Sequence, residues 1–343
     1  MIDVGKLVRE NVINLTPYSS ARDDFKGNTG IFLDANENPF GKLNRYPDPY
    51  QKELRIEISK IKGIAEESIF LGNGSDEIID LCFRVFCNPG IDKVLTFTPT
   101  YGMYEVSAAV NDIKVLKVKL DERFQIDLIN VRPLFSDKKL KLIFICSPNN
   151  PTGNAMLFPD VEYIIKKFNG IVVIDEAYID FSDKPSFIKL VDKYPNLIVL
   201  QTFSKAFGLA AARVGMAFTS PLIIQYFNKV KPPYNISTIN QKAAYRKLQK
   251  AEESALQINT LKRERERLSA VLQKLKMTVK VYPSDANFLL VKVTDAGYIY
   301  DELVRKNIIV RNRSSMVDNC LRITVGRKSE NDRLIKTLKT IEI

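Results

Sequence analysis

The chain contains no histidine among its 343 residues. This absence excludes histidine general bases and serine–histidine–aspartate triads, and it removes most zinc sites, because imidazole serves as base or ligand in all of them. Lysine, tyrosine, aspartate and glutamate remain as the side chains that can move protons. Any acid–base chemistry must therefore be carried out by these four residue types.

Cysteines are few, and long apolar runs are missing. The four cysteines, at positions 82, 87, 146 and 320, show no metal-type pairing, so we expect buried thiols in a reducing compartment. The longest apolar runs, such as LIFIC and IVVI, are too short to cross a bilayer, and the start of the chain lacks the apolar segment of a signal peptide. The sequence therefore predicts a cytoplasmic protein that does not act at a membrane.

An excess of acidic charge is also absent, since 51 basic and 40 acidic residues give a net charge of +11. Such a charge fits an anionic ligand, but it also fits a lysine-rich surface. In LKRERERL (261–268) the basic residues alternate with glutamates, which is typical of a solvated helix face rather than of a phosphate-binding track. We therefore expect no nucleic-acid partner.

What the chain does have is a 45 % share of apolar residues, enough for a sizeable core. From about residue 70 to 220, apolar β-rich runs are separated by helical stretches, as in a mostly parallel sheet covered on both faces. In such sheets ligands bind beyond the carboxyl ends of the strands. The expected strands are 93–97, 141–146, 171–175, 197–203 and 214–219.

The fold class that this layout predicts is α/β, with a three-layer α/β/α large domain and a smaller α+β domain at the C-terminus. After KPPYN (231–235) the pattern changes. We expect one long charged connecting helix from about 239 to 275, followed by strands and two helices. The expected boundaries are an arm over 1–30, a large domain over 31–238, with 31–44 contributing to the small domain, and the connecting helix and small domain over 239–343.

A lysine lies within a run of small and apolar residues, TFSKAFGLAAARVG (202–215). A lysine is ordinarily a surface residue. In a poorly solvated pocket, however, its amine has a lowered pKa and is available as a nucleophile toward a carbonyl group. Thr202, Ser204 and Arg213 supply two hydroxyls and a guanidinium around Lys205, a combination suited to a phosphate group.

A second phosphate-binding element is predicted in GNGSDEIIDL (72–81). Glycines lead directly into a predicted helix, so the amides of Ser75, Asp76 and Glu77 would point toward an anion at the positive end of the helix dipole. A glycine turn followed by an ordinary helix cap is the alternative interpretation.

Three further motifs follow strand ends. In IVVIDEAY (171–178), Asp175 ends an apolar strand and needs a partner, which a protonated ring nitrogen would provide; a helix-capping aspartate is the alternative. Tyr178 can reach the same pocket. Asn150 projects from the turn SPNNPTG, and Tyr101 can stack on a flat ring or belong to the core. Together the motifs indicate an aromatic aldehyde with a phosphate, held covalently by a lysine.

With these motifs in this order, the chain resembles the fold-type I pyridoxal-phosphate aminotransferases, and within them the branch that acts on histidinol phosphate. The resemblance covers essentially the whole chain and implies pyridoxal 5'-phosphate as the cofactor. The stretches that narrow it to this branch are LTPY in LTPYSSAR (15–22), DANENP in LDANENPFG (33–41) and RYPD in NRYPDP (44–49), and CLRITVG (320–326) also matches.

The resemblance also implies roles for the residues that bind the cofactor. Lys205 would hold the cofactor aldehyde and move a proton, and Asp175 would keep the ring nitrogen protonated. Asn150 and Tyr178 would donate to the phenolic oxygen of the ring. Tyr101 would stack on the ring, and Tyr46 would reach the cofactor phosphate from a neighbouring subunit, which implies a homodimer. The other residues expected at the phosphate are Ser75, Asp76, Thr202, Ser204 and Arg213.

The activity that the resemblance implies is amino transfer between L-histidinol phosphate and 2-oxoglutarate, in histidine biosynthesis. Arg322 would bind the carboxylate of glutamate in one half-reaction and the phosphate of the ester in the other. Arg311 and Tyr18 would make further phosphate contacts, although the loop from 311 to 322 is short and Arg313 could replace Arg311. Asn36, Asn150 and Asn287 are expected to line the substrate pocket.

Three alternatives remain open at this point. An aromatic amino-acid aminotransferase and a lyase like phosphothreonine decarboxylase would use the same cofactor. A cofactor-binding regulator that contacts DNA would carry a DNA-binding domain ahead of the aminotransferase-like part, whereas the expected arm begins at residue 1.

Overall fold

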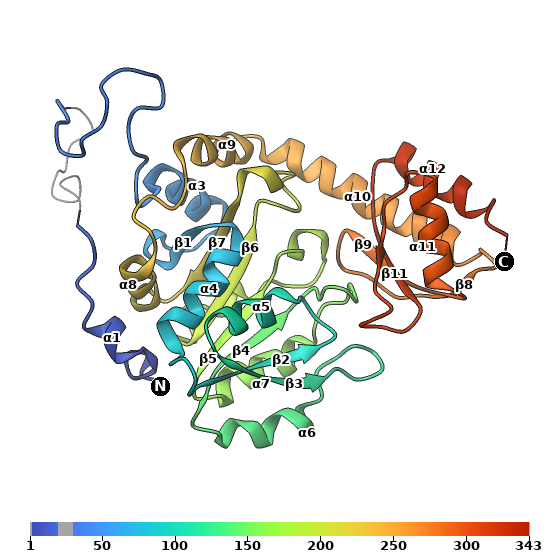
Figure 1. Ribbon diagram of the computed structural model, residues 1–343, viewed down its shortest axis with the longest axis horizontal. Coiled ribbons are helices and arrows are strands. Elements are labelled where there is room, and N and C mark those ends of the chain that lie inside the picture. Colours follow the sequence, from blue (N-terminus) through green and yellow to red (C-terminus); the bar gives the residue numbers. More distant parts are fainter. Residues whose placement is uncertain (1, 20–29, 343) are drawn as a thin grey trace.

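The computed structural model describes residues 2–19 and 30–342. Figure 1 shows a large part built around a seven-stranded sheet and a smaller C-terminal part built around a four-stranded sheet, joined by the long helix α10 (Ala251–Leu272). Of the expected arm, residues 1 and 20–29 lie outside the described residues. None of the helices in the described ranges is both long and apolar enough to cross a membrane.

The large sheet confirms the predicted mostly parallel arrangement. Its strand order is β1-β7-β6-β5-β4-β2-β3, in which β7 runs antiparallel to both neighbours and the remaining pairs are parallel. The central strands are buried along their whole length, which explains their continuous apolar sequences. The strands are β1 (Ile69–Asn73), β2 (Lys93–Thr98), β3 (Lys114–Lys119), β4 (Leu140–Cys146), β5 (Ile171–Asp175), β6 (Leu197–Thr202) and β7 (Val214–Thr219).

Two of these strands were not among the expected ones. β3 reads KVLKVK, and its lysines fit an edge strand, where charged side chains discourage pairing with another sheet. β1 ends in the glycine-containing sequence IFLGN, which weakens a strand pattern. β1 lies at one edge of the sheet and β3 lies at the other.

Helices cover both faces of the large sheet and complete the three layers. In β5, Ile171 and Val173 belong to the apolar core on one face, and Val172 and Ile174 belong to the core on the other. One core includes α1 (Glu10–Ile13), α4 (Gly74–Phe86), α5 (Met103–Val110) and α8 (Pro221–Val230). The other includes α3 (Lys52–Lys62), α6 (Leu128–Val131), α7 (Phe158–Lys167) and α9 (Thr238–Leu248).

The small domain has its own core. Its antiparallel sheet has the order β10-β11-β9-β8, with two helices packed through apolar side chains against it. Its elements are β8 (Thr278–Val281), β9 (Phe288–Val293), α11 (Ala296–Arg305), β10 (Arg311–Asn312), β11 (Cys320–Thr324) and α12 (Lys328–Leu338).

Residues 31–44, expected to contribute to the small domain, lie elsewhere. In Figure 1 this segment lies at the opposite end of the molecule from the small domain. Residues 35–37 and 43–47 line a cavity together with residues 237–239 at the start of α9. The segment forms no helix or strand. Its sequence therefore has no periodic pattern from which its position in the fold could be predicted.

The prediction of one helix from 239 to 275 was wrong, because the chain forms α9 and α10 with a break at Gln249 and Lys250. Neither glycine nor proline marks the break. The prediction of a solvated face for 261–268 was also wrong in part. Glu264 and Arg265 are buried, and Nη1 of Arg265 donates to the carbonyl oxygens of Phe181 (3.2 Å) and Ala286 (2.9 Å).

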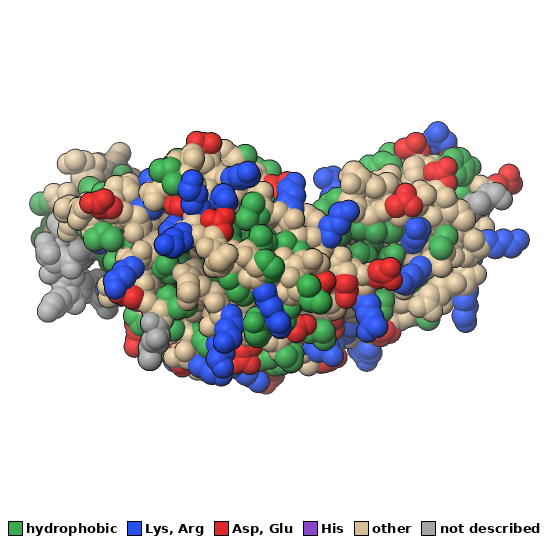
Figure 2. All heavy atoms as spheres, turned by 90° about the horizontal axis from the view of Figure 1, so that it is seen from below, with side chains coloured by type: hydrophobic (Ala, Val, Ile, Leu, Met, Phe, Trp, Pro, Cys, Tyr) green, Lys and Arg blue, Asp and Glu red, His purple; other side chains and the backbone are tan. Residues whose placement is uncertain are grey.

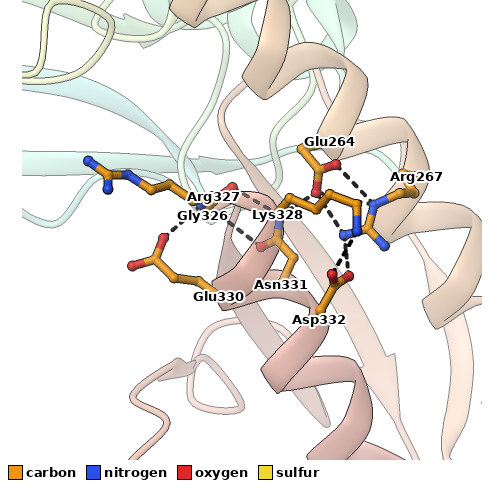
Figure 3. Close-up of polar contacts among 8 residues, drawn as sticks. All are labelled: Glu264, Arg267, Gly326, Arg327, Lys328, Glu330, Asn331 and Asp332. Atoms are coloured by element: carbon orange, nitrogen blue, oxygen red, sulfur yellow. Dashed lines mark hydrogen bonds and ion pairs between the residues drawn. The ribbon is translucent and has the colours of Figure 1, made fainter.

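A polar network ties α10 to the end of β11, as Figure 3 shows. The side-chain amide of Asn331 donates to Glu264 of α10 and to the carbonyl of Gly326, both at 2.9 Å, and it accepts from the Gly326 amide at 3.0 Å. Arg267 pairs with both Glu264 and Asp332 at 2.8 Å. Because Gly326 closely follows β11, the network fixes that strand relative to the connecting helix.

The surface charge is mixed rather than concentrated. On the face in Figure 2, lysine and arginine side chains are scattered among acidic ones. This distribution fits a lysine-rich surface, which was one of the two interpretations of the net charge.

Candidate active site

A cavity of about 380 Å³ lies where the ends of β4, β5 and β6 meet residues of the small domain. Most of the residues singled out in the sequence meet there, although they come from six separate stretches of the chain. Those that line it are Ser75, Asp76, Tyr101, Asn150, Asp175, Tyr178, Thr202, Ser204, Lys205, Arg213, Arg311 and Arg322, together with Arg313.

Lys205 follows β6 and presents its amine to the cavity. Burial by surrounding atoms lowers the pKa of this amine below its usual value, and the guanidinium of Arg322 lowers it further. The Asp175 carboxylate opposes the shift. The Nζ atom lies 5.6 Å from the centre of the Tyr178 ring. A larger fraction of neutral amine favours attack on an aldehyde.

Asp175 ends β5 with its carboxylate almost fully buried. Burial raises the pKa of this carboxyl above its usual value, while hydrogen bonds from the Tyr104 hydroxyl and the Ala177 amide lower it. These bonds are 2.7 Å and 3.0 Å long. The sequence interpretation missed Tyr104, because in FTPTYGMY only Tyr101 was considered.

The start of α4 and Arg213, which also line the cavity, have the features of a phosphate site. The first turn of α4 has no side-chain cap on its amides, and Arg213 lies beside it with Nη2 at 3.2 Å from Oδ2 of Asp76. Gly74 has a φ of 73°, and a Cβ there would overlap the Arg213 guanidinium. The glycine therefore lets the guanidinium approach the start of the helix, where an anion is stabilised.

Three arginines form the wall contributed by the small domain. Arg311 and Arg322 are paired across β10 and β11, and Arg313 follows β10. In the described ranges, none of the three forms an ion pair with a carboxylate. The Nε atoms of Arg313 and Arg322 are buried without a hydrogen-bond partner, and burial lowers the pKa of both groups. Such a cluster suits an anion with more than one negative charge.

Arg322 also connects the two domains, because its Nη1 donates to Oδ1 of Asn150 at 2.6 Å. Since the side-chain oxygen of Asn150 is an acceptor in this bond, its Nδ2 is the group that can donate to a ligand in the cavity. This geometry matches the expectation that Asn150 donates to an oxygen of the cofactor ring.

Other expected residues lie outside this cavity. The Glu77 carboxylate accepts hydrogen bonds from the Asn73 amide and from Nδ2 of Asn235 (2.9 Å). Tyr46 stacks on Tyr234 with ring centres 4.4 Å apart. Asn36 and Tyr46 line a separate cavity, Tyr18 lines a third one, and Asn287 does not line the Lys205 cavity.

The residues present fit pyridoxal phosphate. The uncapped α4 terminus and Arg213 can hold the phosphate, the buried Asp175 carboxylate can face a ring nitrogen, and the Lys205 amine can reach an aldehyde. Arg311, Arg313 and Arg322 would then face the substrate. The lining of one cavity therefore has residues suited to the cofactor and residues suited to an acidic substrate.

Comparison with known proteins agrees with this geometry. The chain belongs to the family described as aminotransferase class I and II, whose sequence model matches residues 20–338. It is 51 % identical to the histidinol-phosphate aminotransferase of Parabacteroides distasonis, covering the full length of both chains. It is 53 % identical to that of Bacteroides thetaiotaomicron, covering 99 % of each. Such identity over the whole chain puts it among the histidinol-phosphate aminotransferases of the family.

Solved structures agree at the level of the fold. The histidinol-phosphate aminotransferase of Clostridium acetobutylicum superimposes with a TM-score of 0.79 at 27 % identity, covering 87 % of this chain and 90 % of that one. That of Sinorhizobium meliloti, in complex with pyridoxal-5'-phosphate, gives a TM-score of 0.79 at 24 % identity, covering 89 % of each chain. The family and the fit of the residues identify pyridoxal 5'-phosphate as the cofactor.

Proposed function

We propose that the chain transfers an amino group between L-histidinol phosphate and 2-oxoglutarate, giving imidazole-acetol phosphate and L-glutamate. Sequence identity of 51 % and 53 % to two histidinol-phosphate aminotransferases, over essentially the whole chain, supports this reaction. The observation that carries it within the molecule is that Lys205, Asp175 and the three arginines of the small domain meet around one cavity.

The residues divide the work in a way that their positions explain. When bound, pyridoxal phosphate supplies an electron sink for bond cleavage at the substrate α-carbon. The Lys205 amine would hold the cofactor aldehyde and would move the proton at the substrate α-carbon. The Asp175 carboxylate balances the positive charge of a protonated ring nitrogen, because it is buried away from water. Asn150 and Tyr178 would donate to the phenolic oxygen of the cofactor ring, and Tyr101 would cover that ring.

The remaining contacts are assigned by charge. Ser75, Asp76, Thr202, Ser204 and Arg213 line the cavity and would surround the cofactor phosphate, and the Glu77 amide belongs to the same helix turn. Arg322 receives the carboxylate of glutamate or the phosphate of histidinol phosphate, since both reactants present an anion to it. Arg311 and Arg313 share the phosphate, because both line the cavity and a phosphate dianion can accept from two guanidinium groups.

Histidinol phosphate is expected to react much faster than histidinol. Loss of the phosphate leaves the arginine cluster without its dianion, which is expected to slow the reaction by roughly 30-fold or more. The measurement is bleaching of the cofactor absorbance in a single half-reaction, with glutamate and imidazole-acetol phosphate as the products of full turnover. Equal rates with both amines would contradict the role of the arginines.

The same assay separates the alternatives. Arg311→Gln and Arg313→Gln are each expected to slow the histidinol phosphate half-reaction while leaving the glutamate half-reaction close to normal. A higher rate with phenylalanine than with histidinol phosphate would favour an aromatic amino-acid aminotransferase. Release of carbon dioxide without a keto-acid acceptor would favour a lyase.

We also propose a homodimer, because Tyr46, Asn36 and Tyr18 line other cavities than the one around Lys205. The segment that carries Tyr46 exposes large apolar side chains, which indicates a surface that another chain covers. Their exposed fractions are 91 % for Ile31, 90 % for Leu33, 82 % for Phe40 and 68 % for Leu43. In this dimer, Tyr46 would contact the cofactor phosphate in the neighbouring subunit.

The dimer predicts that two inactive variants complement each other. Lys205→Ala and Tyr46→Ala chains, unfolded and refolded together, are expected to recover about a quarter of the normal activity, because half of the dimers contain one intact site. The control mixture is Lys205→Ala with Arg213→Ala. Both of those residues belong to the same site, so this mixture is expected to stay inactive. Failure of the first mixture to recover activity would overturn the assignment of Tyr46.

A cytoplasmic location is part of the same proposal. All four cysteines are buried free thiols, as expected from the sequence. Free thiols are usual in a reducing compartment.

A further inference from the structure

Tyr104 lies directly behind the wall of the active-site cavity. It is in the first turn of α5, its side chain is 1 % exposed, and its hydroxyl donates to Oδ2 of Asp175 at 2.7 Å. Unlike Tyr101, it does not line the cavity. It therefore contacts the carboxylate without being placed to contact a ligand.

The bond from Tyr104 completes the anchoring of the carboxylate. Oδ1 of Asp175 accepts from the Ala177 amide at 3.0 Å, and Oδ2 accepts from Tyr104. Two donors, one on each oxygen, fix the plane of the carboxylate and favour its ionised form. Because each oxygen has a second lone pair, Asp175 can still accept a hydrogen bond from the side of the cavity that it lines.

The Tyr104 ring is itself held firmly on two sides. It stacks on Phe144 of β4, with ring centres 4.9 Å apart and an angle of 15° between the planes. It meets Tyr101 edge to face at 5.6 Å and 87°. The hydroxyl of Tyr101 in turn donates to Asp76 at 3.2 Å. The buried Tyr104 ring thus supports both the Asp175 carboxylate, which would face the nitrogen of the cofactor ring, and Tyr101, which would cover that ring.

We propose that Tyr104 is a positioning residue for the cofactor: its hydroxyl holds the Asp175 carboxylate as a fixed acceptor opposite the ring nitrogen. The inference rests on the assignment of pyridoxal phosphate to this cavity. It does not depend on the identity of the amino donor, so it is tested without any substrate.

Titration of Asp175 is the property that separates positioning from simple packing. Burial raises the pKa of its carboxyl, and the Tyr104 hydroxyl is the foremost group that lowers it again. Removing the hydroxyl therefore raises the pKa of Asp175, so the carboxylate is lost at a higher pH than in the unchanged protein. The other ionisable groups that face it are Asp76, Tyr101, Cys146, Tyr178 and Lys205.

Tyr104→Phe is expected to weaken binding of pyridoxal phosphate to the cofactor-free protein by about ten- to a hundredfold, the usual effect of losing a hydrogen bond to a buried charge. Titration by fluorescence gives the Kd between pH 5 and pH 8. The affinity of the variant is expected to fall at a higher pH on acidification than that of the unchanged protein. An unchanged Kd with an unchanged pH dependence would overturn the proposal.

Tyr194→Phe is the matched control. Its hydroxyl also donates to a carboxylate, that of Glu162 at 2.9 Å, but neither residue lines the cavity. This variant is expected to keep the normal Kd and pH dependence, and an equal loss in both variants would also overturn the proposal. Thermal unfolding of the cofactor-free proteins shows whether both variants are folded.

A second modification covers the case in which Tyr104→Phe does not fold. Fluorotyrosine incorporated at position 104 keeps the ring and the hydroxyl but makes the phenol more acidic and a stronger donor. The pH at which the affinity for pyridoxal phosphate falls on acidification is then expected to be lower than in the unchanged protein. This shift is opposite to the effect of removing the hydroxyl. No movement, or movement to a higher pH, would contradict the role of the hydroxyl.

Discussion

Replacing Lys205 with alanine is expected to lower turnover by roughly 10⁴- to 10⁶-fold, the range for loss of a covalent nucleophile. The reason is that Lys205 both holds the cofactor aldehyde and moves the proton at the substrate carbon, and no histidine is present to replace it. Borohydride reduction of the loaded protein, followed by peptide mapping, is expected to fix the cofactor on position 205. The variant is expected to show no such label.

Lys193→Ala provides the control, because Lys193 is a surface residue paired with Glu162 outside the cavity. It is expected to retain normal turnover and normal labelling. Retention of turnover by Lys205→Ala, or a label on another lysine of the unchanged protein, would refute the assignment of the nucleophile and with it the proposed reaction.

Asp175→Asn is expected to lower kcat of both half-reactions by roughly 10²- to 10⁴-fold with little change in KM, because a neutral amide keeps the shape of the carboxylate but not its charge. The ring nitrogen would then lack the negative partner that makes the ring an effective electron sink. Single-turnover rates with glutamate and with histidinol phosphate provide the measurement. A change confined to KM would mean that Asp175 only binds.

Glu176→Gln is a demanding control for this prediction. Glu176 is the next residue in the same motif and is also buried, but its carboxylate accepts from the Ser186 hydroxyl, the Phe187 amide and Nε2 of Gln201 instead of lining the cavity. Its removal is expected to leave kcat within about tenfold of normal. A loss of kcat as large as that of Asp175→Asn would show that removing either buried carboxylate at this strand end impairs the enzyme. The effect of Asp175→Asn would then not be specific to the cavity.

The parts of the site that were predictable from the sequence are those whose chemistry is unusual for their surroundings. Lys205 in an apolar run and Asp175 at the end of an apolar strand both require an explanation, and parallel strands bring their ends to one edge of a sheet. The same argument predicted that Asn150, which follows β4, lies near these two residues, and Asn150 does line the cavity. Each of these predictions depended on a short sequence pattern in which a strand is followed directly by a turn.

The parts that were missed depend on contacts between distant segments. Tyr104 has the sequence environment of an ordinary core tyrosine, and only its bond to Asp175, 71 positions away, reveals its role. Glu264 and Arg265 appear in a charged run, yet their partners lie on α12 and on loops of both domains. Local charge patterning cannot indicate burial when the compensating groups are remote in sequence.

The division of the cavity between two sheets has an evolutionary consequence. Lys205, Asp175 and Asn150 lie at or just after the ends of strands of the large sheet, whereas Arg311, Arg313 and Arg322 belong to the small domain. Arg322 is tied to Asn150 of the large domain, so the changes that can alter which acidic group is selected with the least effect on the coenzyme site are those at Arg311 and Arg313. A descendant of this chain can therefore acquire a new substrate by mutations within a single hairpin, provided that they keep Arg322 and its bond to Asn150.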